Sequence, residues 1–390
     1  MSRRFLVIGA GISGLATAVA LQRRGHDVTV LEERVDASSG TAISIWPNAL
    51  AALDRIGLGD AVRESGGRVS AGAMRWSDGT WLRRPSPERI VAALGEPLVV
   101  VRRSVLTRIL ADALTEGTVE SGVAASELVL TATGVRVTTS DGGTREVAAV
   151  VGADGVGSMV ARHLNGTLRR RYAGYTAWRG IAEYALDPSL AGETVGIGTE
   201  FGHVPLGATH TYWFGTERQP EGGVSPAGEL THLRSRYGSW VDPVPALLAA
   251  TDPADVLRSD LYDREPARQW SRGPVVLVGD AAHPMRPHLG QGGCQGLEDA
   301  ATLAHCVDAV DDLPGAFARF AEMRRPRTMA LTRESRLFGR IVNARPALLG
   351  AAAMRASAVV PEAILRRHLA SVAGRAAFVL SSDRSERPSG

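Results

Sequence analysis

The chain has 390 residues, of which 44% are hydrophobic and 22% are charged, with 44 glycines and 20 prolines. This composition excludes a disordered chain, a collagen-like repeat and a small disulfide scaffold, and the length is enough for two packed lobes. All 44 basic residues are arginines, and against 41 acidic residues they leave a formal net charge of only +3. Because no strong basic stripe or patch stands out, we do not expect nucleic acid as a partner.

Cysteine content and apolar segments narrow the class further. Cys294 and Cys306 lack the C-x-x-C or Cys/His spacing of a zinc site, so we expect no metal and no disulfide framework. Two cysteines in a chain of this length suit a reducing cytoplasm, and no signal peptide is expected. The most membrane-like stretch, residues 346–365, is interrupted by an arginine, a proline and a glutamate, so we expect no membrane span.

The first 31 residues form a unit of predicted strand, turn, helix and strand. Residues 4–8 are predicted to be a buried strand, residues 9–14 a glycine-rich turn, residues 15–24 a helix and residues 27–31 a second buried strand. In a G-x-G-x-x-G turn, Gly9 permits the tight turn, Gly11 lets the backbone approach a pyrophosphate and Gly14 lets the helix pack on the strand. The helix start offers N–H groups and a positive dipole end to phosphates, so the unit predicts a dinucleotide site.

Glu32 ends the second strand and completes this pattern. A carboxylate in that place accepts hydrogen bonds from a ribose 2′-hydroxyl and disfavours a 2′-phosphate. Glu33 is the alternative acceptor. This motif by itself does not distinguish FAD from NAD.

The middle of the chain alternates helical and strand patterns. Residues 48–56 are predicted to be a short helix, residues 68–100 strands and loops, and residues 104–115 an amphipathic helix. Residues 128–131, 135–139 and 147–151 are predicted to be three strands of a meander, joined at turns that contain Thr133-Gly134 and Asp141-Gly142-Gly143.

The second half begins with a region rich in aromatic and turn residues. Residues 170–270 are predicted to form a mostly antiparallel lobe, followed by a buried strand over 274–278 and a helix over 295–310. Residues 317–340 are predicted to form a long arginine-rich helix with a kink at Pro326, and the tail from residue 381 is expected to be disordered. The nucleotide-binding lobe is therefore expected to be discontinuous, with the second lobe inserted into it.

Two further motifs identify a family. The first is Val151-Gly152-Ala153-Asp154-Gly155, and the second is Gly279-Asp280-Ala281-Ala282-His283-Pro284, which continues to Leu289-Gly290-Gln291-Gly292-Gly293. With the first glycine turn, they resemble the class A flavin-dependent aromatic hydroxylases typified by p-hydroxybenzoate hydroxylase, in the branch of salicylate hydroxylase and zeaxanthin epoxidase. The resemblance covers residues 4–340.

The resemblance implies an α/β fold in which a Rossmann-like FAD-binding domain carries an inserted, mostly antiparallel β substrate domain and C-terminal helices. The expected boundaries are 1–70, 100–170 and 273–345 for the FAD-binding domain, 71–99 and 171–272 for the substrate domain, and 346–390 for the C-terminal helices and tail. The residues implied in FAD binding are Gly9, Gly11, Ser13, Gly14, Glu32, Glu33, Thr41, Ala42, Ile43, Arg103, Asp154, Asp280, Pro287, Gly290, Gly292 and Gly293.

The resemblance also assigns roles within this set. Arg103 corresponds to an arginine that opens a helix beside the FAD phosphates, and Asp280 to the acid that binds the ribityl chain. Asp154 belongs to a motif that serves both FAD and NAD(P)H, and Thr41, Ala42 and Ile43 to a loop near the flavin ring. From the residues alone, a helix that starts near Gln295 behind three glycines would also stabilise an anionic reduced flavin.

Three residues are candidates for work on the substrate. Arg179 can pair with a phenolate or carboxylate or steady the flavin ring, and Tyr212 corresponds to a tyrosine that touches substrate in related hydroxylases. Ordinary cross-strand packing is the alternative for both. The resemblance places His288 where flavin meets substrate, whereas His283, beside a proline at a loop start, is more often a packing or hydrogen-bonding residue.

The expected function is an FAD-dependent monooxygenase that consumes NADH or NADPH. A flavin C4a-hydroperoxide formed with O₂ would hydroxylate or epoxidise an aromatic or terpenoid small molecule, in cytoplasmic secondary metabolism. Two alternatives stay open: a flavin-dependent reductase or dehydrogenase on the same fold, and a non-catalytic flavin-binding sensor. Uncoupled oxygen insertion would indicate the first, and failure of NAD(P)H to bleach the flavin the second.

Overall fold

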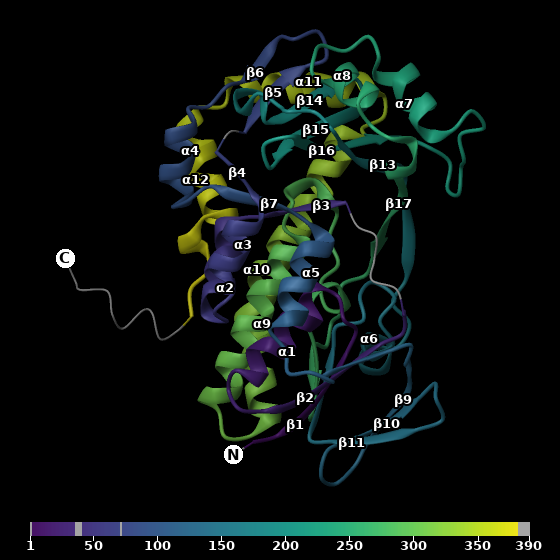
Figure 1. The fold of residues 1–390 in the computed structure, drawn as a ribbon, viewed down its shortest axis with the longest axis vertical. Helices are drawn as coiled ribbons and strands as arrows, with labels where there is room; N and C mark the ends of the chain where they lie inside the picture. Colours follow the sequence, from purple (N-terminus) through teal and green to yellow (C-terminus); the bar gives the residue numbers. More distant parts are fainter. Residues whose placement is uncertain (1, 36–40, 71, 381–390) are drawn as a thin grey trace, which may run out of the picture.

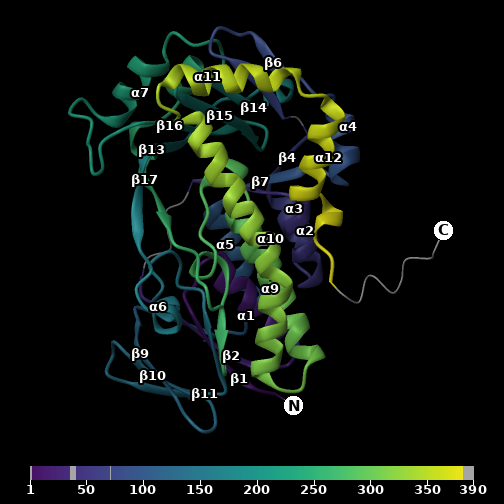
Figure 2. The same cartoon turned by 180° about the vertical axis from the view of Figure 1, so that it is seen from behind.

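The computed structural model describes residues 2–35, 41–70 and 72–380. Within these ranges the strands form four sheets, and the two larger sheets occupy opposite ends of an elongated molecule (Figure 1). A long helix runs between the two ends (Figure 2). The tail from residue 381, expected to be disordered, lies outside the described residues.

Six of the described strands form a mostly parallel sheet in the order β18-β19-β12-β1-β2-β8. Apolar, β-branched runs with both faces buried are typical of such a sheet, and β1 pairs in parallel with both β2 and β12. The strands come from three separate stretches of chain: β1 Arg4–Ile8, β2 Asp27–Glu32, β8 Val119–Ser121, β12 Ala149–Gly152, β18 Ser271–Arg272 and β19 Val275–Leu277.

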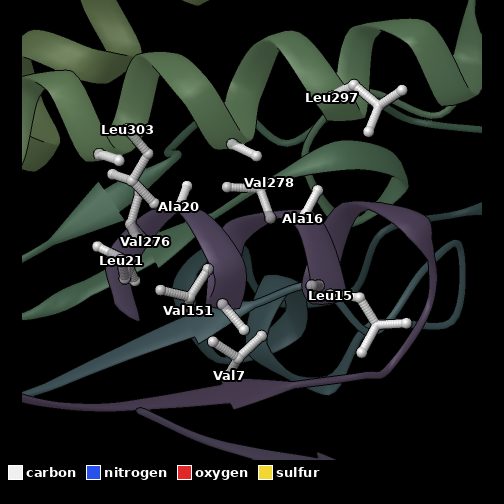
Figure 3. Packing of buried hydrophobic residues seen from close by; sticks show 14 of the residues in the cluster. Val7, Leu15, Ala16, Ala20, Leu21, Val151, Val276, Val278, Leu297 and Leu303 are labelled. Atoms are coloured by element: carbon white, nitrogen blue, oxygen red, sulfur yellow. The ribbon is translucent and has the colours of Figure 1, made fainter. Parts of the chain in front are cut away.

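The main core lies between this sheet and the helices α1 (Ile12–Gln22) and α9 (Gly292–Ala309). Figure 3 shows Val7 and Val151 of the strands beneath α1, and Val276 between Leu21 of α1 and Leu303 of α9. Helix α5 (Arg103–Asp112) packs against α1. The strand, helix and strand predicted at the N-terminus are confirmed.

The predicted meander required one correction. Strands β9 (Ala125–Leu130), β10 (Val135–Thr139) and β11 (Thr144–Val147) form it, but residues 147–151 are not one strand. The chain leaves the meander at Val147 and enters the six-stranded sheet as β12, whose four residues are all buried. A continuous apolar run hides this change of sheet because both strands bury Val side chains. Helix α6 (Met159–Asn165) follows β12.

Seven of the described strands form the second large sheet, in the order β17-β13-β16-β15-β14-β5-β6. It is antiparallel, as predicted, except that β5 pairs with β14 in parallel. Helices α7 (Glu229–Tyr237) and α8 (Val244–Ala249) cover one face around Trp178 and Trp213. The strands are β5 Ala73–Trp76, β6 Trp81–Arg83, β13 Arg170–Ala182, β14 Gly192–Gly196, β15 Thr199–Leu206, β16 His210–Glu217 and β17 Leu257–Arg264.

A small sheet in the order β3-β7-β4 lies between the two large ones. Its strands are β3 Ala42–Ile45, β4 Gly67–Val69 and β7 Leu98–Arg102, flanked by helices α2 Pro47–Arg55, α3 Gly59–Ser65 and α4 Pro87–Leu94. Helix α4 was missed in the region predicted as strands and loops, although Ser86 caps it. Ala42 and Ile43 were predicted in a loop, but they belong to β3, where β-branched residues pair with β7.

Helix α10 (Leu313–Val342) is the long helix predicted, and it continues through Pro326. Helices α11 (Ala347–Ala356) and α12 (Glu362–Ala373) follow, and short 3-10 turns include η3 (Gly279–Ala281), η4 (Pro287–Leu289) and η5 (Ser357–Val359). No single helix in the described ranges is long and apolar enough to cross a membrane. One pair of helices, over 347–359 and 362–373, meets that criterion by length and composition alone, and the two helices are bent by 105° relative to each other.

Candidate active site

The glycine turn between β1 and α1 has the geometry that the sequence predicted. Gly9 has a φ of +103°, and a Cβ there would lie 2.5 Å from the Ala153 carbonyl oxygen. A Cβ on Gly14 would lie 1.9 Å from the Gly9 carbonyl oxygen, so neither position admits a side chain. A Cβ on Gly11 would meet nothing within 4 Å, and Gly11 is exposed. The turn therefore offers an open backbone at the start of α1, as a pyrophosphate requires.

Ser13, predicted to bind cofactor, has its side chain packed against α9 and the η3 turn. A Cβ on Gly296 would lie 2.0 Å from Ser13 Oγ, and one on Gly279 would lie 2.4 Å from it. The hydroxyl therefore fills the contact between α1 and α9. Only the backbone of Ser13 remains for the predicted contact with phosphate.

Glu32 and Glu33 differ in their surroundings. Glu32 Oε2 accepts a hydrogen bond of 2.8 Å from the Ala10 N–H in the glycine turn, and its other oxygen accepts one of 3.1 Å from the Arg34 N–H. Glu33 is exposed. Glu32 is thus the carboxylate held at the edge of the predicted nucleotide site.

Arg103 is placed by two neighbouring elements. It is the first residue of α5, and its backbone N–H donates to the Thr41 carbonyl oxygen at 2.9 Å. The side chain is exposed at the end of β7, beside the strand that carries Ala42 and Ile43. The helix start and the guanidinium therefore meet next to the predicted cofactor site.

Asp280 lies in the turn η3, directly after β19. Burial raises the pKa of its carboxyl, while the charges of His283 and Arg103 act in the opposite direction. The residue is nevertheless exposed to solvent. The Asp280 carboxyl is therefore surrounded by protein but still reached by solvent, as in a concave site.

A fully buried network holds this turn in place. Asp299 of α9 accepts hydrogen bonds from the Gly279 N–H at 2.8 Å and pairs with His283 Nε2 at 2.6 Å. Arg324 of α10 donates through Nε to the other Asp299 oxygen at 2.6 Å and also pairs with Glu298. His283 is therefore a buried hydrogen-bonding residue, as its position beside a proline indicated.

The start of α9 faces the same region. Gly290 has a φ of +60°, and Pro287 and Gly290 are exposed while Gly292 and Gly293 are half-buried. A Cβ on Gly293 would lie 2.7 Å from Ile43 Cδ1, so the glycine lets β3 approach the helix start. The N–H groups of the first turn and the positive end of the helix dipole are available to an electron-rich group.

These residues fit an FAD molecule. The open turn at Gly11 and the carboxylate of Glu32 suit its ADP half, and the accessible Asp280 carboxyl suits its ribityl hydroxyls. All lie beyond the carboxyl ends of parallel strands, where ligands bind in sheets of this kind. Among the described residues, no group of three or more His, Cys, Asp and Glu side chains is arranged to hold a metal.

Asp154 has a structural role of its own. Its carboxylate accepts hydrogen bonds from Ser158 Oγ at 2.5 Å, from the Met159 N–H at 2.7 Å and from the Val160 N–H at 3.3 Å. These bonds hold the start of α6, and burial raises the pKa of the carboxyl. Its predicted service to FAD and NAD(P)H stays a prediction.

Arg179 and Tyr212 lie on one face of the seven-stranded sheet. Arg179 on β13 pairs with Phe214 on β16, and Tyr212 follows two residues away on the same face. Burial raises the pKa of the Tyr212 hydroxyl, and the Arg179 guanidinium and the Thr41 side chain act in the opposite direction. The pair therefore meets the segment that carries Thr41, which places it beside the FAD-binding residues.

The His288 side chain lies between the two ends of the molecule and is fully buried. Nε2 is 2.6 Å from the Tyr175 hydroxyl on β13, and Nδ1 is 3.1 Å from Glu200 Oε1 on β15. Phe338 of α10 packs on the ring. The accessible part of this segment is its backbone, so the imidazole positions the segment through Tyr175 and Glu200.

Sequence reasoning missed several partners in the site. Asp299, Arg324 and Glu200 stand in no recognised motif position, and the roles of all the missed partners depend on contacts between distant segments. Tyr175 alone carried a signal, because it opens the Tyr-Thr-Ala-Trp-Arg-Gly segment that contains Arg179.

Comparison with known proteins agrees with this geometry. The family described as FAD binding domain matches residues 4–335. The chain is similar to aurachin C monooxygenase/isomerase of Stigmatella aurantiaca, with 36% identity over 323 residues that cover 82% of this chain and 84% of that protein. It is also similar to 3-amino-4-hydroxybenzoate 2-monooxygenase of Streptomyces cremeus, with 34% identity over 343 residues that cover 85% and 86%.

A solved structure shows the same architecture. Klebsiella pneumoniae HpxO complexed with FAD and uric acid matches with a TM-score of 0.89 at 30% identity, over 95% of this chain and 96% of that chain. A single family thus accounts for the glycine turn, the Asp280 turn and the seven-stranded sheet. The chain belongs to the FAD-binding class A monooxygenases, has their p-hydroxybenzoate hydroxylase-like fold, and is an FAD-dependent monooxygenase.

Proposed function

We propose that this enzyme consumes NADH or NADPH and transfers one oxygen atom of O₂ to an aromatic or alkene-containing small molecule bound against the seven-stranded sheet. The meeting of Arg179 and Tyr212 with the Thr41 segment carries the proposal, because it brings polar groups of the sheet to the FAD-binding residues. The FAD-binding domain would comprise residues 1–70, 100–170 and 273–345, and the substrate domain residues 71–99 and 171–272.

Bound FAD supplies the redox chemistry and the activation of O₂. The chain would hold its adenosine diphosphate half at Gly9–Gly14 and Glu32 and its ribityl chain at Asp280. The N-terminus of α9, at Gly292 and Gly293, would stabilise negative charge in the reduced ring system. The buried network of His283 and Asp299 would keep the Asp280 turn in one orientation.

On the substrate side, Arg179 would bind an acidic oxygen of the substrate and favour an electron-rich, deprotonated ring. Tyr212 would hydrogen-bond the substrate or the reacting oxygen. His288 would act as a positioning residue, since its side chain is buried and its contacts are Tyr175 and Glu200. Its bonds would fix the backbone of η4 between the flavin and the sheet.

The setting of the reaction is also proposed. Two free, buried cysteines suit a reducing cytoplasm. The relatives named above act on aurachin C and on 3-amino-4-hydroxybenzoate, which favours a role in the metabolism of natural products.

The decisive experiment is a screen of aromatic and alkene compounds for stimulated NADH or NADPH oxidation, followed by product mass. A product heavier by one oxygen atom supports the proposal. Stimulated oxidation that yields a reduced or dehydrogenated product identifies a reductase or dehydrogenase instead. Failure of NADH and NADPH to bleach the flavin with every compound identifies a flavin-binding protein without turnover.

A further inference from the structure

A row of residues across the seven-stranded sheet remains partly accessible beside a row that is fully buried. Pairing places Arg179 on β13, Phe214 on β16, Gly202 on β15 and Glu193 on β14 side by side on one face. We call these four residues the central row. Arg179, Phe214 and Glu193 are half-buried, and a Cβ on Gly202 would lie 2.1 Å from the Phe214 ring, so the ring covers the glycine.

The neighbouring row on the side of α10 is closed. Its members Ala177, Thr216, Glu200 and Val195 are all buried. The central row is therefore where this face of the sheet stays open to a ligand, next to Tyr212 and the FAD-binding segments.

Glu193 is an unusual member of the row. Its carboxylate makes no hydrogen bond or ion pair within the described part of the chain, and the charge that acts on it is that of Glu200, on the adjacent strand. Met74 on β5 pairs with it, and Phe338 and Ile341 of α10 belong to the same apolar cluster as Met74. Arg83 on β6 pairs with Met74 in turn, but its guanidinium donates to the Ser357 and Val360 carbonyl oxygens and not to Glu193. Burial and Glu200 together raise the pKa of Glu193 to about 8.

A partly buried carboxyl without a partner is costly to the fold, and such groups gather at binding sites. A ligand that donates an N–H to Glu193 would satisfy the carboxylate and offset the repulsion from Glu200. Arg179 stands at the opposite end of the row, three strands away, which corresponds to about 14 Å between backbones. The row thus has a cationic end and, above about pH 8, an anionic end, with an aromatic surface between them.

We propose that Glu193 binds an N–H group of the substrate, so that the substrate class is an aromatic compound with an acidic oxygen at one end and a nitrogen donor at the other. The inference rests on the proposed function, because it takes the central row as the substrate surface. Phe214 would stack on the ring, and Arg179 and Glu193 would set which edge of the ring faces the flavin.

The test uses two probes of the same shape, 5-hydroxyindole and 5-hydroxybenzofuran, which differ by an N–H donor against an oxygen acceptor. Affinity is measured at pH 9, where Glu193 is ionised, on the FAD-loaded enzyme from the change in flavin absorbance on titration. We expect the indole to bind about tenfold more tightly than the benzofuran, as a hydrogen bond to a charged group allows. In Glu193→Ala the preference should fall to about twofold or less.

The pH dependence gives a second readout. An N–H donor favours the ionised carboxylate, so the indole should bind more tightly as the pH rises from 6 to 9, and the benzofuran should not. Glu193→Gln keeps an acceptor oxygen of the same shape and does not titrate, so its indole affinity should be independent of pH in this range. Glu183→Gln, at an exposed acid beyond the end of β13, is the matched control and should behave like the parent.

Equal affinity for the two probes, or no binding of either, overturns the proposal. So does a preference that Glu193→Ala leaves unchanged. If Glu193→Ala does not retain FAD, the pH profile of Glu193→Gln decides. Oxygenated products from nitrogen-free compounds at undiminished rate in Glu193→Ala would leave the monooxygenase function standing and remove this inference. Selective binding of the indole without any NAD(P)H oxidation would support this inference and contradict the proposed NAD(P)H-consuming function.

Discussion

At the scale of single residues, the site depends on carboxylates that differ in how many hydrogen bonds and ion pairs they already make within the protein. Asp299 is fully paired and Asp154 caps a helix, whereas Asp280 is accessible and Glu193 has no bond within the described chain. Satisfied carboxylates hold the scaffold, and unsatisfied ones are available to ligands. This distinction decides where substitutions should affect cofactor or substrate rather than the fold.

Replacing Asp280 with alanine should remove the acceptor for the ribityl chain. We expect the purified variant to be colourless or to lose FAD on desalting, while Asp280→Asn should retain part of it. The measurement is the ratio of flavin to protein after gel filtration. Asp187→Ala, at an exposed acid in the connection between β13 and β14, is the control. Normal FAD content and turnover in Asp280→Ala would show that the motif is wrongly assigned.

Glu32 and Glu33 provide a matched pair for the adenosine half. The parent should release FAD, not FMN, on denaturation and chromatography. Glu32→Ala should weaken FAD binding by about 1.5–3 kcal/mol, because a charge-assisted bond to the ribose and the bond to Ala10 N–H are both lost. Glu33→Ala should leave the dissociation constant unchanged. A larger loss of FAD affinity in Glu33→Ala than in Glu32→Ala would mean that Glu33, and not Glu32, binds the ribose.

Arg179 and Tyr212 should control how well NAD(P)H oxidation is coupled to product. Arg179→Met and Tyr212→Phe each remove a polar contact on the substrate side, so coupling should fall at least about tenfold while FAD content stays normal. Product formed per NAD(P)H consumed is the readout. If coupling is unchanged in both variants, the two residues serve only the packing of the sheet.

At the scale of helices and strands, sequence patterns predicted those elements whose structure depends on neighbouring residues. The glycine turn, β1, α1 and β2 follow from spacing and apolar periodicity over 30 residues, and they are correct. The split of residues 147–151 into β11 and β12 depends on which sheet each half joins, and no local pattern encodes that choice. The direction of the His288 side chain depends in the same way on Tyr175 and Glu200, which come from another sheet.

The network between α9, α10 and η3 is the strongest polar element of the core. Asp299→Ala would leave the buried Arg324 and His283 without one partner, and we expect a loss of about 3–5 kcal/mol in the free energy of unfolding. Urea unfolding of the apo and FAD-bound forms measures it. Asp299→Asn keeps the shape and should lose less.

The same network predicts a pH dependence. His283 and Arg324 hold the pKa of Asp299 at about 2, below its ordinary value of 3.8, so the ionised form is stabilised by folding. This stability is present above about pH 4 and is lost as the pH falls from about 4 toward 2. The stability difference between the parent and Asp299→Asn should therefore shrink below pH 4. A difference independent of pH would contradict it.

At the scale of the whole molecule, the two large sheets are joined by more than chain connections. Helix α10 runs from the core of the six-stranded sheet to the seven-stranded sheet (Figure 2). Arg286, on the segment that leads to α9, pairs with Asp263 of β17 at 2.6 Å and lies over the Tyr175 ring, 5.4 Å from its centroid. The substrate surface and the FAD-binding residues are thus fixed to each other by buried or half-buried contacts.

We therefore expect the two sheets to unfold together. Five of the seven tryptophans lie on or beside the seven-stranded sheet, with Trp178 and Trp213 buried in it, so tryptophan emission reports mainly on that end. The rise of flavin fluorescence on release reports on the other end. The two thermal transitions should coincide, and FAD at one hundred times its dissociation constant should raise both by about 3 °C, from about 2.7 kcal/mol of linkage. Arg286→Met removes a contact between the ends, so its tryptophan transition should fall below the flavin transition, whereas Arg333→Met, at an exposed site on α10, should keep the two together. Separate transitions in the parent enzyme would mean that the sheets are independent, and that FAD binding does not organise the substrate surface.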